Sequence, residues 1–118
     1  RRKGLHRLLW KAVSKEELGR VEQMVMRLND ETFGVHVSDV KLQFASSQWG
    51  SCSPSGTIML NSALLFVRPE VIKYVILHEL AHRKRADHSP QYWQWVEWAM
   101  PGYEKAREGL YDYRLPTI

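Results

Sequence analysis

Apolar residues recur at helical spacing in the first third of the chain. From Leu18 to Leu28 they stand three or four residues apart, the period that places side chains on one face of a helix. Ser14 is followed by two glutamates, a pattern typical of a helix N-terminus, and Gly34 lies where the apolar pattern stops. We therefore predict a helix over about residues 15–32 with its apolar face in the core.

A strand is predicted after this helix, because residues 35–44 alternate apolar and polar side chains. His36 falls on the polar side of that strand, so we expect it at the surface. Residues 45–56 are dense in turn-forming residues, and the apolar run 57–61 predicts a second short strand. The two strands are interpreted as a hairpin with a long connection, in which Trp49 wedges the loop against the core.

The second half of the chain predicts helices that are separated by prolines. Residues 62–67 form a short helical or extended segment, and Pro69 then suits the first turn of a helix that reaches about Arg85. The apolar face of the first helix is expected to pack on it. Ser89 caps the next helix, which begins with Pro90 and ends near residue 100, and a last helix is predicted over about 103–111.

The helix predicted from Pro69 carries the sequence His78-Glu79-Leu80-Ala81-His82. Residues four apart on a helix lie one turn apart on the same face, so both imidazoles can reach one metal ion. Glu79 points to the side, where its carboxylate can take a proton from water on the metal. This is the chemistry of the H-E-x-x-H motif, so we interpret Glu79 as a general base.

The surroundings of the motif make a chance match improbable. Residues 71–81 are apolar or aromatic except at three positions, and two of those are His78 and Glu79. Burying such groups without partners costs several kcal/mol, and a metal ion removes that cost. The alternative is a pair of core histidines without metal. A purely structural zinc site is disfavoured, because the single Cys52 cannot build a thiolate-rich site and is expected to be a small packed residue.

A catalytic zinc ion needs a third protein ligand, and the chain offers two candidates. His88 lies six residues after His82, and Pro90 just beyond it forces the chain to turn, which can bring His88 back to the motif. Glu97 lies fifteen residues after His82 on the next predicted helix, a distance at which some zinc peptidases supply a glutamate. The residues alone favour His88 and leave Glu97 open.

Composition indicates the number of domains and the cell compartment, but it does not identify the function. The 118 residues are 44% hydrophobic, which predicts one domain spanning residues 1–118. The net charge of +4 allows contact with nucleic acid or acidic substrates, although the basic residues are spread along the chain. The single cysteine predicts a reducing, cytoplasmic compartment, and the apolar runs are too short for a signal peptide or a membrane span. The first residue is not Met, which leaves open an excerpt of a longer protein.

The region from about Phe44 to Leu110 resembles the YgjP-like metallopeptidases, a family of small zincin-type domains related to the SprT-like proteases. The blocks that carry the resemblance are Trp49-Gly-Ser-Cys-Ser53, Ile58 to Asn61, Tyr74 to His82, His88-Ser89 with Tyr92-Trp93, and Pro101 with Tyr103. It implies zinc (Zn²⁺) binding by His78, His82 and His88, with Glu79 as general base. It also implies an α+β fold, with a small mixed sheet packed on a central H-E-x-x-H helix and further helices around it.

The chain departs from related patterns at three positions. Gln48 stands where the family often has a basic residue before its Trp-Gly-Ser-Cys block, which puts a role of that charge in doubt here. Tyr92 replaces a phenylalanine expected before Trp93, a mild change. Arg85 stands where the metzincin zinc motif has its turn-forming glycine, so membership of the metzincins is not indicated.

Three functions remain open at this point. The first is a zinc-dependent endopeptidase that cleaves proteins or peptides, with residues 57–61 binding the extended substrate as an added strand. The second is a zinc-bearing domain that binds nucleic acid, for which the run Arg83-Lys84-Arg85 beside the motif is the support. The third is a latent or accessory domain of a larger enzyme.

Overall fold

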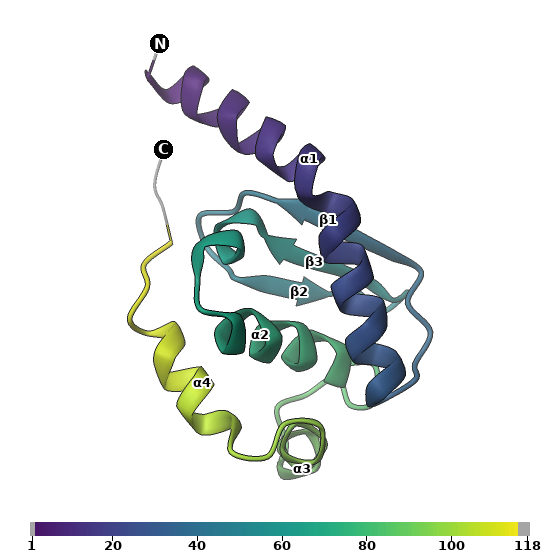
Figure 1. The fold of residues 1–118 in the computed structure, drawn as a ribbon. Coiled ribbons are helices and arrows are strands. Elements are labelled where there is room, and N and C mark those ends of the chain that lie inside the picture. The colour runs from purple at the N-terminus through teal and green to yellow at the C-terminus, as the bar shows by residue number, and fades with distance from the viewer. Residues whose placement is uncertain (1, 116–118) are drawn as a thin grey trace.

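The computed structural model describes residues 2–115. These residues form an α+β fold of four α-helices, one short 3-10 helix and a three-stranded mixed sheet (Figure 1). In chain order the elements are α1 (Arg2–Glu31), β1 (Asp39–Gln43), β2 (Gly50–Cys52), β3 (Thr57–Asn61), η1 (Ser62–Phe66), α2 (Pro69–Ala81), α3 (Pro90–Ala99) and α4 (Tyr103–Leu110). None of the described helices combines the length and apolar character needed to cross a membrane.

The sheet has the strand order β1-β3-β2 and is mixed, as predicted. β1 pairs with β3 in parallel, and β2 pairs with the other edge of β3 in antiparallel orientation. The expected hairpin between residues 35–44 and 57–61 is therefore wrong. The turn-rich segment contains the three-residue strand β2, which takes the antiparallel edge of β3 and leaves β1 to pair on the opposite edge.

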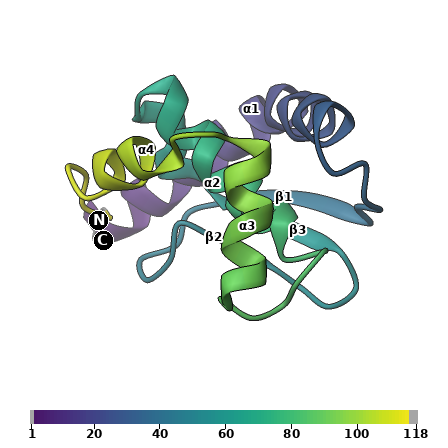
Figure 2. The same ribbon diagram turned by 90° about the horizontal axis from the view of Figure 1, so that it is seen from below.

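The motif helix α2 lies at the centre of the fold. It contacts β2 and β3 of the sheet and all three other α-helices. Figure 2 shows α1 and α2 on the same side of the sheet. The packing of the first helix on α2 is confirmed, because α1 contacts α2 and its residues Val21, Val25 and Leu28 are buried. α2 therefore carries its histidines on a helix that the whole core holds in place.

α1 begins at Arg2, well before the predicted start near residue 15. Ser14 is not an N-cap. Its hydroxyl donates to the carbonyl of Trp10 at 2.7 Å and also contacts the hydroxyl of Ser62. A serine inside a helix can bond to the carbonyl four residues before it, so this residue lies mid-helix and ties α1 to η1. Ser89 likewise precedes α3 without a side-chain cap, although Pro90 begins that helix as predicted.

α2 ends at Ala81, four residues before the predicted end. His82 is the C-cap, and the backbone N–H groups of Arg83 and Lys84 bond to the carbonyls of Leu80 and Ala81. These i to i+3 bonds tighten the last turn, as at many helix ends. The tight turn redirects the chain toward α3.

Candidate metal centre

Three imidazoles converge at the C-terminal end of α2. His78 lies in the last turn of α2, His82 is its C-cap, and His88 lies in the loop before α3. Each offers a ring nitrogen, and these atoms lie within 4.8 Å of one another. Two nitrogens bound to one zinc ion lie at most about 4.2 Å apart, so an ion fits after shifts of less than about 1 Å. The donor set and its spacing therefore suit a zinc-sized ion.

The loop that places His88 is braced by its own side chains. Nε of Arg85 lies 3.0 Å from Oδ1 of Asp87, and the same oxygen accepts the backbone N–H of Ser89 at 3.2 Å. Partial burial, together with the neighbouring His82 and His78, lowers the pKa of His88. The neutral imidazole, which is the form that binds metals, is thereby favoured.

The other two histidines are oriented by partners at Nδ1. Nδ1 of His82 lies 3.1 Å from the carbonyl oxygen of Arg85. A carbonyl accepts hydrogen bonds only, so Nδ1 carries the proton and Nε2 keeps its lone pair. Nδ1 of His78 lies 3.3 Å from Oε2 of Glu79. Such partners fix the tautomer and the ring direction of histidines in metal sites.

Tyr92 is the fully buried residue against which the cluster packs. Its ring centroid lies 4.5 Å from that of His82, 5.0 Å from His88 and 5.5 Å from His78. Its hydroxyl donates to the backbone carbonyl of His78 at 2.7 Å, which satisfies an acceptor at the end of α2. Burial raises the pKa of Tyr92, so this donor stays protonated. Tyr92 therefore packs under the cluster and holds the end of α2.

Glu79 is buried beside the edge strand β2, with 7% of its surface exposed. A side chain at Gly50 would place its Cβ 3.0 Å from the carbonyl oxygen of Met59, 3.1 Å from Cγ of Glu79 and 3.2 Å from Oε2 of Glu79. The absence of a side chain at Gly50 therefore lets β2 lie directly against the carboxylate. Sequence reasoning did not find this role, although Gly50 belongs to the block that supported the resemblance.

Gly50→Ala is expected to reduce kcat by about 10- to 100-fold while metal binding is retained. The added methyl displaces the Glu79 carboxylate or β2, and a shift near 1 Å at a general base, the role predicted for Glu79, costs on the order of 100-fold. Peptidase assays with metal analysis of the purified variant measure both quantities. Gly19→Ala is the matched control, because a Cβ there meets nothing within 4 Å. Equal activity of Gly50→Ala and the unchanged chain would show that Glu79 tolerates a side chain at this position.

The structure separates the two candidates for the third ligand. His88 joins His78 and His82, whereas Glu97 is exposed on α3 and faces a different, shallow depression beside Trp98 and Tyr103. Cys52 is half-buried against the core, and burial raises the pKa of its thiol. Among the described residues, the cluster that could hold a metal ion is therefore built from histidines alone.

A cleft of about 550 Å³ opens beside the cluster. Its walls contain aromatic side chains together with His78, Glu79 and His88. Its lining residues are Trp49, Gly50, Tyr74, Val75, His78, Glu79, His88, Trp93, Arg107, Leu110 and Tyr111. A volume of this size suits a few side chains of a peptide.

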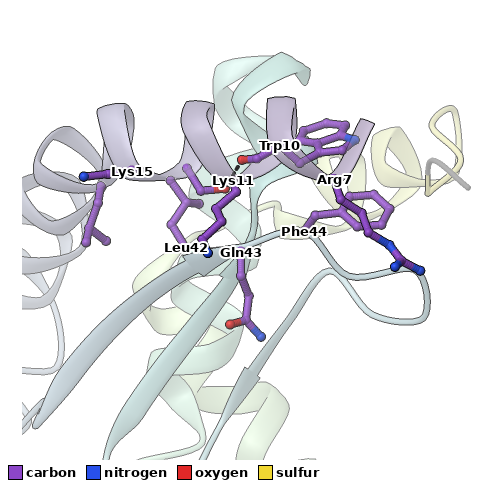
Figure 3. A pocket seen from close by; sticks show the side chains of 9 residues that line it. Arg7, Trp10, Lys11, Lys15, Leu42, Gln43 and Phe44 are labelled. Carbon is purple, nitrogen blue, oxygen red and sulfur yellow. Dashed lines mark hydrogen bonds between the residues drawn. The ribbon is translucent and has the colours of Figure 1, made fainter. Parts of the chain in front are cut away.

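A second groove of about 590 Å³ lies between α1 and the end of β1 (Figure 3). The rings of Trp10 and Phe44 stack there with centroids 5.1 Å apart. Its rim carries Arg7, Lys11 and Lys15, and its lining contains no His, Cys, Asp or Glu. This groove therefore has none of the side chains that usually bind a metal ion.

The basic run after the motif is engaged within the chain. Its three side chains have these partners: the carbonyls of His36 and Pro54 for Arg83, the ring of Trp95 for Lys84, and the carboxylate of Asp87 for Arg85. His36 itself is exposed, as predicted. These contacts tie the loop after α2 to its surroundings, which gives the run a structural role.

The chain is similar to known metallopeptidases in sequence and in structure. The family model described as "YgjP-like, metallopeptidase domain" matches residues 1–113. The metallopeptidase zymogen abylysin of Pyrococcus abyssi is 32% identical, with a TM-score of 0.64 over 75% of this chain and 87% of abylysin. The metallopeptidase zymogen jannalysin of Methanocaldococcus jannaschii is 16% identical, with a TM-score of 0.68 over 78% of this chain and 94% of jannalysin. This similarity supports the fold. No curated protein sequence matches the chain.

Proposed function

This chain belongs to the YgjP-like metallopeptidase family, and on that premise we propose that it hydrolyses peptide bonds with a zinc ion held by His78, His82 and His88. The observation that carries the proposal is the convergence of three imidazole nitrogens within 4.8 Å of one another. Catalytic zinc sites use three protein ligands and keep one open position. Nitrogen donors favour zinc over magnesium or calcium, which take oxygen ligands.

Glu79 acts as the general base in this proposal. When bound, the zinc ion would polarise the substrate carbonyl and lower the pKa of water toward about 7. The Glu79 carboxylate accepts a proton from the attacking water and later passes it to the leaving amine nitrogen. Its place in the cleft wall, 3.3 Å from Nδ1 of His78, supports this role.

The substrate strand binds at β2 rather than at β3. Both edges of β3 are paired, so the predicted addition of a substrate strand to residues 57–61 is wrong. β2 pairs with β3 alone among the described strands, and its Gly50 lies against Glu79. An extended peptide can therefore add to the outer edge of β2 through main-chain hydrogen bonds. Such binding places a peptide bond beside the metal cluster with little dependence on sequence.

Metal removal provides the direct test. Chelation is expected to abolish cleavage of an unfolded protein by this chain, and added Zn²⁺ is expected to restore it, whereas Mg²⁺ alone is not. The measurement is the rate of peptide-bond cleavage with the same preparation before chelation, after chelation and after zinc addition. Cleavage that persists in the metal-free protein would contradict the proposal.

Nucleic-acid binding stays a prediction, and its support is reduced at one of its three basic residues. Arg85 has an acidic partner in Asp87, whereas Arg83 contacts two carbonyls and Lys84 a ring, so two of the three positive charges are not paired with an acid in the described part of the chain. A steep fall of DNA affinity with salt would favour that function. The role of a latent or accessory domain stays a prediction. The described residues leave a cleft of about 550 Å³ beside the cluster, as an active peptidase requires.

A further inference from the structure

Arg107 of α4 lines the same cleft as His78 and His88 of the cluster. Its guanidinium carbon lies 5.5 Å from the ring centroid of Trp93 and 5.4 Å from that of Tyr103. Those two rings stack on each other at 5.5 Å, and Trp93 also stacks on His88 at 5.9 Å. A continuous aromatic wall thus joins this arginine to the third histidine.

The charge of Arg107 is not neutralised by the described part of the chain. The ion pairs found there use Arg20, Arg27, Arg68 and Arg85, and none uses Arg107. The only acidic residue in the cleft lining is Glu79, which the proposed function already uses. The half-buried guanidinium lies over two rings and has no acidic partner in the described part of the chain, so its charge is available to an anionic ligand.

The aromatic wall also joins Arg107 to the motif helix. Tyr103, over which the guanidinium lies, stacks on Tyr74 with ring centroids 6.1 Å apart. Tyr74 belongs to α2 and lines the cleft with His78. Arg107 therefore lies on the same cleft wall as groups of the motif helix.

We propose that Arg107 selects substrates that carry a carboxylate next to the bond to be cleaved. The two rings hold the guanidinium in the cleft wall, and no hydrogen bond to another described side chain occupies its N–H groups. A guanidinium can bind a carboxylate with two parallel hydrogen bonds. The carboxylate comes from an Asp or Glu side chain or from the free C-terminus of a short peptide. The inference rests on the proposed peptidase activity and adds a substrate class to it.

Matched peptides test this selection. One pair differs by Glu or Gln beside the cleaved bond, and a second pair differs by a free or amidated C-terminus. The unchanged chain is expected to cleave the acidic member of one pair with a kcat/KM about 10- to 100-fold higher, the range for a charge-assisted hydrogen bond. Preference in the first pair identifies a side-chain carboxylate, and preference in the second identifies the C-terminus.

Variants of Arg107 assign the preference to this residue. Arg107→Gln is expected to remove the preference while it keeps zinc content and cleaves the neutral peptides within about threefold of the unchanged chain. Arg107→Lys is expected to retain part of the preference. Lys105→Gln is the control, at an exposed position of α4 outside the cleft, and is expected to retain all of it. A preference that survives Arg107→Gln, or no preference in the unchanged chain, would overturn the inference.

A binding measurement separates this inference from the proposed function. If the unchanged chain cleaves none of the peptides, the peptidase proposal fails, and tryptophan fluorescence then reports their binding to the zinc-loaded chain. Tighter binding of the acidic member, lost in Arg107→Gln, would support carboxylate recognition on its own. Equal binding of both members would overturn it.

Discussion

Glu79→Gln is expected to lower kcat by about 100- to 10,000-fold while the zinc content stays unchanged. Glutamine has the shape of glutamate, so it fits the buried space between β2 and His78. Its amide cannot accept the proton of the attacking water, and a positioned general base contributes about 10²–10⁴-fold to such reactions. Turnover of an unfolded protein, together with metal analysis of the same preparation, measures both effects.

Glu70→Gln is the matched control for this experiment. Glu70 is an exposed glutamate in the first turn of the same helix, remote from the histidine cluster. It is expected to leave turnover unchanged. Full activity of Glu79→Gln would reject the general-base role, and loss of zinc from that variant would instead assign Glu79 to metal retention.

Local rules predicted most of the elements that carry the site. Pro69 and Pro90 each begin a helix, because a proline lacks the N–H that the first helical position does not need. Val40 and Leu42 alternate with exposed residues in β1, as the period of a strand requires. The four-residue spacing of His78 and His82 placed both imidazoles on one face. These features depend on neighbours in the sequence, which is why the pattern revealed them.

The errors arose where residues far apart in the sequence decide the outcome. Ser14 before two glutamates has the local pattern of a helix start, but the chain before it is helical too, and the hydroxyl contacts Ser62. The parallel pairing of β1 with β3 depends on β2 occupying the opposite edge. Hydrophobic alternation is the same in a parallel and an antiparallel strand, so it could not reveal this topology.

The residues that complete the site came from remote elements. Gly50 acts through the space that it leaves beside Glu79, and a glycine in a turn-rich segment gives no sign of such a contact. Arg107 enters the cleft because α4 packs on α2, and no motif marks it. Tyr92 and Val96 stand four residues apart in α3, so their shared buried face was predictable, while the hydrogen bond of Tyr92 to His78 was not.

His88→Ala is expected to weaken zinc binding by more than 100-fold, whereas Glu97→Ala leaves it unchanged. Loss of a ligand costs more than loss of an outer partner of a ligand, which is worth about 10- to 100-fold. His88 lies in the cluster, and Glu97 faces another depression. Competition with a chromophoric zinc chelator measures both affinities, and circular dichroism of the metal-free proteins checks that each variant folds. If Glu97→Ala lost the metal and His88→Ala kept it, the ion would be held by a glutamate, and the loop before α3 would have to move away from its described position.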